Sequence, residues 1–190
     1  MTADHFSADD DAANALAASG QAGNGGIAVG GAVGGAVGGA VGGDAGRRAA
    51  IVAAARGWIG TPYRHQASCR GVGADCLGLV RGIWREVLGQ EPARPPAYTP
   101  DWAEATGEER LLDAALRHLV QVPSDAAGPG DVVLFRMLER GPAKHAAILV
   151  SPWLPRGTVV HAYSGHAVCE TRLTDAWARR LAGVFRFPGA

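Results

Sequence analysis

The spacing of apolar residues changes once along this chain, at Gly128-Pro129-Gly130, and this change constrains the fold more than any other feature. Before it, apolar residues recur at helical spacing, whereas after it they form short runs separated by turn residues. Helices followed by strands are typical of an α+β domain rather than of alternating βαβ units. We therefore expect N-terminal helices packed on an antiparallel β-sheet.

The helical segments differ in how clearly they are marked. The clearest is 75–88, because its apolar residues share one face and Gly89 follows as a stop signal. The expected helices are 47–58, 75–88, 108–120 and 175–181, and the expected strands are 131–137, 145–150, 158–163, 167–171 and 183–187.

The first 46 residues have a different composition from the rest. From Gly30 to Gly43 the sequence repeats GGAV in steps of four. Glycine loses the most backbone entropy on ordering, and Ala and Val bury little area in return, so a flexible linker is favoured. We expect residues 1–46 to be a disordered acidic and Gly/Ala/Val-rich extension, and residues 47–190 to form the folded domain. A membrane helix over residues 21–43 is one alternative, disfavoured because Leu and Phe are absent there, and fibrous self-assembly is another.

Charge is unevenly distributed along the chain. Residues 1–46 contain five Asp and no Lys or Arg, so the remaining residues carry 18 basic against 18 − 5 = 13 acidic side chains. A mildly basic domain suits an anionic polymer such as peptidoglycan. Without a dense Lys/Arg run, nucleic acid is not an expected partner.

The three cysteines, Cys69, Cys76 and Cys169, are too few and too scattered for a disulfide framework or a paired zinc site. The N-terminal sequence MTADHFSADDD also lacks the basic start and apolar run of a secretory signal. We therefore expect synthesis in the cytoplasm without a signal peptide.

Cys76 is the candidate nucleophile. It follows the flexible run 71–75 and is expected in the first turn of helix 75–88, with Asp75 as N-cap. The positive end of a helix lowers a thiol pKa, which favours the reactive thiolate. A small buried cysteine packing helix against sheet is the alternative.

Two histidines downstream are candidates for the partners that a thiolate needs. His145 begins an apolar strand after the turn 142–144, and His161 lies in the next strand. Neighbouring strands would bring His161 against the far nitrogen of His145 and fix its tautomer. His145 is thus the expected base and His161 its orienting residue.

Five short segments occur in the order found in NlpC/P60 cysteine peptidases, and residues 47–188 resemble that family. They are Gly60-Thr61-Pro62-Tyr63, Asp75-Cys76-Leu77-Gly78-Leu79-Val80, Pro129-Gly130-Asp131-Val132-Val133-Leu134-Phe135, Lys144-His145-Ala146-Ala147-Ile148 and Val160-His161-Ala162.

This resemblance implies a papain-like fold and a Cys76-His145-His161 triad, with no metal or organic cofactor. It also implies that Tyr63 lines the substrate cleft and that Asp75 helps to bind a free peptide amine. The implied substrates are peptidoglycan stem peptides, cut between D-glutamate, through its γ-carboxyl, and diaminopimelate. Leu77 departs from the family, which commonly has Ser after the nucleophile, and this affects the expected fine specificity.

The closing segments 168–173 and 183–188 resemble the branch found in phage tails and gene transfer agents. This resemblance implies phage-like tail or baseplate partners and action at the cell wall or periplasm, as part of a particle that aids DNA delivery. Two other functions fit the same fold: a non-catalytic tail or peptidoglycan-binding module, and an acyltransferase or amidase.

Overall fold

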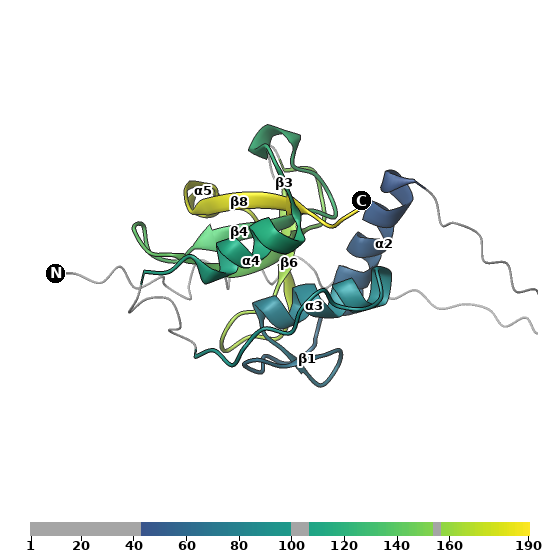
Figure 1. The fold of residues 1–190 in the computed structure, drawn as a ribbon, viewed down its shortest axis with the longest axis horizontal. Coiled ribbons are helices and arrows are strands. Elements are labelled where there is room, and N and C mark those ends of the chain that lie inside the picture. Colours follow the sequence, from purple (N-terminus) through teal and green to yellow (C-terminus); the bar gives the residue numbers. More distant parts are fainter. Residues whose placement is uncertain (1–42, 100–106, 154–156) are drawn as a thin grey trace, which may run out of the picture. The chain divides into compact units, whose positions relative to one another are not determined.

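A computed structural model describes residues 43–99, 107–153 and 157–190 (Figure 1). Residues 1–42, which make up most of the expected extension, lie outside the described residues, as do the two alternatives for that tract. Within the described part of the chain, no helix is both long and apolar enough to span a bilayer.

In the part of the chain that the structure describes, three α-helices precede the main-sheet strands, with a small hairpin between the first two of these helices, and a short helix lies between the last two strands. The helices are α2 (Asp44–Gly57), α3 (Cys76–Val87), α4 (Arg110–His118), the 3₁₀ turn η1 (Ser124–Ala126) and α5 (Asp175–Arg179). The main-sheet strands are β3 (Val120–Val122), β4 (Val132–Arg136), β5 (Ala143–Leu149), β6 (Thr158–His161), β7 (Cys169–Arg172) and β8 (Leu181–Arg186), and a small hairpin joins β1 (Ser68–Cys69) to β2 (Gly73–Ala74).

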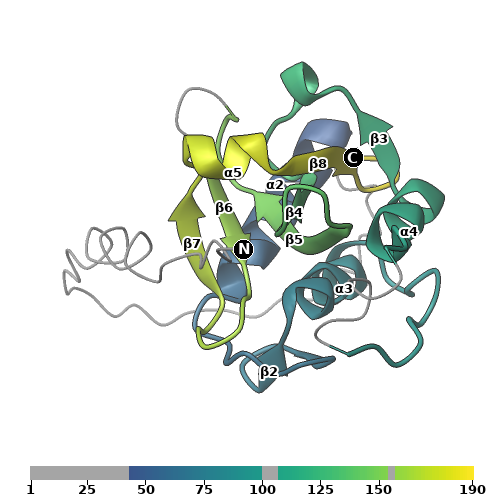
Figure 2. The same ribbon diagram turned by 90° about the vertical axis from the view of Figure 1, so that its left-hand side faces the viewer.

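The six-stranded sheet is antiparallel throughout, in the order β3-β8-β4-β5-β6-β7. Helices α2, α3 and α4 contact β5 on one face, and α5 places Trp177 in a second apolar cluster with alternate residues of the same strands (Figure 2). The expected α+β architecture, with helices packed on an antiparallel sheet, is confirmed.

Three expected boundaries are wrong for physical reasons. The helix expected over 108–120 ends at His118, because Val120–Val122 pairs with β8 as an edge strand. The expected turn at 142–144 is also shorter, since Ala143 and Lys144 already belong to β5, where Ala143 pairs with Arg136 of β4 and Lys144 lies at a bulge. Helix α2 in turn begins earlier than expected, with Asp44 in its first turn, where a carboxylate interacts favourably with the helix dipole.

A buried ion cluster joins the first helix to the sheet. Asp131 is fully buried, and its carboxylate accepts from Arg48 of α2 at 2.7 Å and from Arg186 of β8 at 2.9 Å. The two guanidinium groups hold the pKa of Asp131 below its usual value, against the opposing effect of burial. The segment before β4 is therefore fixed to both α2 and β8.

Close packing also fixes helix α3. A Cβ atom on Gly82 would lie 2.0 Å from Cζ2 of the buried Trp58, so only glycine allows α2 and α3 to approach this closely. Helix α3 is in this way held in place at its middle, while its first residue, Cys76, lies beside β5.

Candidate active site

The N-terminus of α3 places the Cys76 thiol. Asp75 is the N-cap, as expected, and its Oδ1 accepts a hydrogen bond of 2.7 Å from the Gly78 N–H. The Cys76 Sγ lies 3.9 Å from the carbonyl oxygen of Lys144, and the backbone N–H of Ala146 lies near enough to the sulfur to lower the thiol pKa. The sulfur therefore lies against the backbone on both sides of His145.

The two predicted histidines meet, as expected from their neighbouring strands. His145 Nε2 lies 2.8 Å from His161 Nδ1, and both side chains are buried. Strand pairing explains the contact, because the β5–β6 register, continued by one residue, puts His161 opposite Ala147 and hence diagonal to His145 on the same face.

Thr171 extends this chain of contacts, because its Oγ1 lies 3.0 Å from His161 Nε2. Thr171 comes from β7 and pairs with Val159, two residues from the His161–Cys169 pair, so it too is a diagonal neighbour. Trp177 of α5 packs against both imidazoles, with ring centroids 5.6 Å from His145 and 5.7 Å from His161. Each imidazole is thus held by a polar neighbour and by the ring of Trp177.

Burial controls the ionisation of the thiol and imidazoles. It raises the pKa of Cys76 to about 11, with a further increase from the Asp75 charge, and it lowers the pKa of His145 to about 4. Burial also lowers the pKa of His161, aided by the charges of His145 and His166. The backbone N–H groups of Cys76 and Leu77 at the helix start lower the thiol pKa, as expected, but burial outweighs them, so the net pKa of the thiol is raised in this substrate-free state.

Cys76 and His145 are consequently both neutral at neutral pH. Among the described residues, the thiol's hydrogen-bond acceptor is the Lys144 carbonyl rather than an imidazole nitrogen. Catalytic hydrogen bonds are commonly long or poorly aligned before substrate binds. The relevant observation is therefore that the Cys76 sulfur lies against the backbone next to His145.

The two predicted substrate-binding residues, Tyr63 and Asp75, both lie beside the nucleophile, but Tyr63 is half-buried whereas Asp75 is buried. Tyr63 is half-buried and forms an isolated bridge with Ala74, so its side chain starts next to Asp75 and Cys76. Burial, then the charges of Asp75 and Cys76, raise the Tyr63 pKa. Asp75 is only 2 % exposed, and its carboxylate is already occupied by hydrogen bonds within the protein.

Sequence reasoning did not identify Thr171, Trp177, Tyr98 or His65 as parts of this site. Thr171 could have been found only from the exact β6–β7 register, and Trp177 only from the position of α5. Tyr98 and His65 come from irregular segments, where no periodicity predicts which side chain reaches Asp75.

Comparison with known proteins agrees with this geometry. The NlpC/P60 family model matches residues 60–186, which include Tyr63, Cys76, His145 and His161. This chain belongs to the NlpC/P60 family.

Relatives of this NlpC/P60 chain include a gamma-DL-glutamyl hydrolase of Bacillus subtilis (strain 168), which is 29% identical over 141 residues. The match covers 72% of this chain but only 29% of that relative's length.

Two solved structures share the fold. An NlpC/P60 family protein from Bacillus cereus ATCC 10987 has a TM-score of 0.52 at 18% identity, covering 74% of this chain and 40% of that one. NlpC2 from Trichomonas vaginalis has a TM-score of 0.50 at 18% identity, covering 80% and 48%. At such identities the likeness concerns the fold of the NlpC/P60 domain alone.

Proposed function

We propose that this chain is a cysteine peptidase that hydrolyses amide bonds in peptidoglycan stem peptides. The observation that carries the proposal is the position of the Cys76 sulfur at the start of α3, against the backbone of His145, whose imidazole is bonded to His161. A nucleophile, a base and a residue that orients the base are the parts that thiol-based acyl transfer needs.

The hydrogen-bond chain supports a direction for proton transfer. If His161 donates from Nε2 to the Thr171 hydroxyl, its Nδ1 is an acceptor and receives the Nε2 proton of His145. His145 Nδ1 is then unprotonated and is the nitrogen available to take the thiol proton. In this tautomer His145 acts as base and His161 as the residue that orients it.

The reaction then follows in two steps. Proton transfer from Cys76 to His145 generates the thiolate, which attacks the substrate carbonyl, and the imidazolium returns the proton to the leaving amine. Water, deprotonated by His145, then attacks the thioester and releases the acid while the thiol is restored. The Cys76 N–H lies at the start of α3, so it is placed to stabilise the oxyanion.

The proposed scissile bond joins the γ-carboxyl of D-glutamate to diaminopimelate. The family resemblance supports this bond, and the name of the Bacillus subtilis relative, a gamma-DL-glutamyl hydrolase, supports a γ-glutamyl linkage as the bond that is cut.

Mass spectrometry of purified stem tripeptide and tetrapeptide, incubated with the full chain, tests the activity and the bond together. We expect a fragment that ends at D-glutamate and a second that starts with the free amine of diaminopimelate. Transfer of the acyl group to an added amine, with little hydrolysis, would favour an acyltransferase. Intact peptides would favour a non-catalytic tail or peptidoglycan-binding module.

Delivery to the wall is the second part of the proposal. The resemblance of segments 168–173 and 183–188 to phage-tail and gene-transfer-agent peptidases supports assembly into a phage-like tail or baseplate, with action at the wall or periplasm. The chain should then co-purify with such particles, and Cys76→Ala particles should assemble and bind cells but deliver DNA poorly. Particles that lack the chain, with all of it free in the cytoplasm or bound to its own cell's envelope, would contradict this part.

A further inference from the structure

An apolar cavity, here called the slot, lies between α3 and α4, over the face of the sheet that both helices contact through β5. Its lining residues recur every three or four positions on each helix, from Leu77 to Trp84 on α3 and from Leu111 to His118 on α4. Each set therefore follows one helix face for two turns, or about 10 Å. A cavity that is elongated along two helices fits a linear molecule better than a compact one.

The interior of the slot is apolar and has room for a ligand. Val132 and Leu134 of β4 and Ala146 of β5 line it from the sheet, and each is 1 % exposed. Ala115 of α4 is another small lining residue, and its methyl group leaves space unfilled. The volume of the slot is about 250 Å³, and apolar cavities of about 150 Å³ already bind small apolar molecules. A chain of CH₂ groups would therefore be stabilised here by burial.

Leu77 adds to this apolar lining. It is the position at which the chain departs from the Ser that the family commonly has after the nucleophile. Here the Leu77 side chain lines the slot and packs against the main core cluster. The departure from the family thus supplies apolar surface to a cavity that the proposed hydrolysis does not use.

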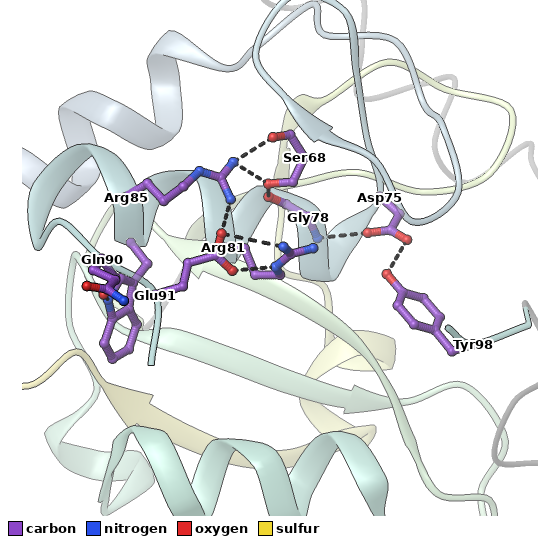
Figure 3. Close-up of polar contacts among 9 residues, drawn as sticks. Ser68, Asp75, Gly78, Arg81, Arg85, Gln90, Glu91 and Tyr98 are labelled. Carbon is purple, nitrogen blue, oxygen red and sulfur yellow. Dashed lines mark hydrogen bonds and ion pairs between the residues drawn. The ribbon is translucent and has the colours of Figure 1, made fainter. Parts of the chain in front are cut away.

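Residues 89–99, here called the strap, run beside α3 and cover the outer side of the slot. At one end, the Glu91 carboxylate accepts from Arg81 of α3 at 2.6 Å. At the other end, the Tyr98 hydroxyl donates to Asp75 Oδ2 at 2.6 Å, as Figure 3 shows. Both ends of the strap are therefore fixed to α3 or to its cap.

The middle of the strap is stiff as well. Pro92, Pro95 and Pro96 all line the slot. A proline ring fixes φ and leaves no N–H that needs a partner, so this segment can keep its course without pairing to a strand. Because the strap is held at both ends and stiff between them, the slot is formed before any ligand binds, which reduces the entropy cost of binding.

Positive charge at the edge of the slot indicates what kind of molecule it takes. Arg94 of the strap and Arg117 of α4 line the slot and are exposed, and neither guanidinium has a hydrogen bond or ion pair among the described residues. The one carboxylate among the described lining residues, Glu91, is already bonded to Arg81 and Arg85. Guanidinium groups bind carboxylates through paired, charge-assisted hydrogen bonds. The slot therefore combines an apolar interior with an anion-binding edge.

We propose that the slot binds a linear acyl chain that ends in a carboxylate, with the chain between α3 and α4 and the carboxylate on Arg94 and Arg117. A free molecule is favoured over a lipid held in a bilayer, because the strap covers the outer side of the slot. This site is additional to the proposed peptidase centre and does not depend on its activity.

A titration of the full chain with octanoate, followed through its backbone amide signals by NMR, tests the site. Octanol removes the charge, octylammonium reverses it, and acetate removes the chain. We expect saturable octanoate binding that shifts the signals of Leu77, Ala114 and Ala146, with about tenfold weaker binding of octanol. Octylammonium should bind more weakly still, and acetate should not bind. No saturable octanoate binding, shifts that leave these three residues unmoved, or equal affinity for octanol or octylammonium would overturn the inference.

Two variants separate the chain from the charge. Ala114→Leu fills the slot with a side chain that a helix tolerates, and should abolish octanoate binding. Arg94→Gln/Arg117→Gln should weaken octanoate binding about tenfold and leave octanol binding unchanged. Arg179→Gln is the matched control, because α5 lies against the other face of the sheet, and it should change neither.

The amide spectrum of each variant also reports whether it folds. Unchanged octanoate binding in folded Ala114→Leu or in the double arginine variant, or an equal loss in Arg179→Gln, would contradict the site. Binding of phosphatidylglycerol vesicles without binding of octanoate would assign the slot to a membrane lipid and also overturn the inference. Because no turnover is measured, a failure of the proposed hydrolysis leaves this test unaffected.

Discussion

Single residues decide the resting state of this site. The Cys76 thiol and the His145 imidazole are both neutral near pH 7, because burial disfavours their charged forms by more than the neighbouring hydrogen bonds favour them. The thiolate therefore has to be generated in the complex, where substrate displaces water and His145 takes the proton. An enzyme with a preformed thiolate–imidazolium pair would behave differently toward alkylating reagents.

Alkylation of Cys76 by iodoacetamide should follow the pKa of about 11. We expect its rate to rise about tenfold per pH unit between pH 6 and 10, because only the thiolate reacts and its fraction rises in this way. Peptide mapping by mass spectrometry separates Cys76 from the other two cysteines, Cys69 and Cys169. A rate that is high and constant above pH 6 would show a preformed ion pair instead.

Thr171→Val should lower kcat about fivefold with little change in KM, because one neutral hydrogen bond that orients His161 is worth about 1 kcal/mol. Thr171→Ser keeps the hydroxyl and should restore most of the rate. Thr174→Val is the matched control, since Thr174 is exposed and its side chain makes no cap hydrogen bond to α5. Equal losses in the Val and Ser variants at position 171 would argue against an orienting role.

The elements differ in how far the sequence could predict them. Helix α3 was predictable because its apolar face, the Asp75 cap and the Gly89 stop agree with one another. Strand β3 was not, since Val120 continues the helical pattern of α4 and becomes a strand only by pairing with β8. The β1–β2 hairpin has two residues per strand, too few for any periodicity to show.

The same distinction holds for the candidate site. His145 and His161 were found together because consecutive strands commonly pair. Tyr98 was not found, because the path of an irregular strap depends on anchors such as Glu91, whose partners lie elsewhere in sequence. The sign of the Cys76 pKa shift also depends on burial, which a helix-start position does not reveal.

Asp131→Asn should destabilise the packing of α2 against the sheet. We expect a loss of about 3 kcal/mol or more in the free energy of unfolding, because the change leaves Arg48 and Arg186 without their buried counter-charge. Urea unfolding monitored by circular dichroism measures it. Arg56→Gln, which breaks an exposed pair with Glu170, is the control and should cost less than about 1 kcal/mol. Similar losses in the two variants would contradict a structural role for the Asp131 cluster.

At the scale of the whole molecule, the buried histidines link stability to pH. Folded His145 has a pKa of about 4 and folded His161 is also well below the ordinary 6.5, whereas both are ordinary in the unfolded chain. Below pH 6.5 the unfolded chain binds protons that the folded chain does not. Their contribution is therefore fully present above pH 6.5 and is lost as pH falls toward 4.

Between pH 7 and pH 5 the free energy of unfolding should accordingly fall, by up to about 1.4 kcal/mol per pH unit for each histidine. The melting temperature should fall with it. The pKa values of Glu91 and Glu170 are lowered, so these carboxylates stay ionised in this window. His145→Gln should flatten the dependence, because it removes one of the two buried imidazoles. A melting temperature that is constant from pH 7 to pH 5 would contradict the burial of two neutral imidazoles.

The most direct test of the account is the rate at which Cys76→Ala hydrolyses a stem tetrapeptide, measured beside the unaltered chain by mass spectrometry. Helix α3 begins at Cys76 with its cap supplied by Asp75, so the variant should fold normally, which its melting temperature checks. We predict a fall in kcat of at least about three orders of magnitude, as for removal of a covalent nucleophile. A rate within tenfold of the unaltered chain would show that Cys76 is not the nucleophile.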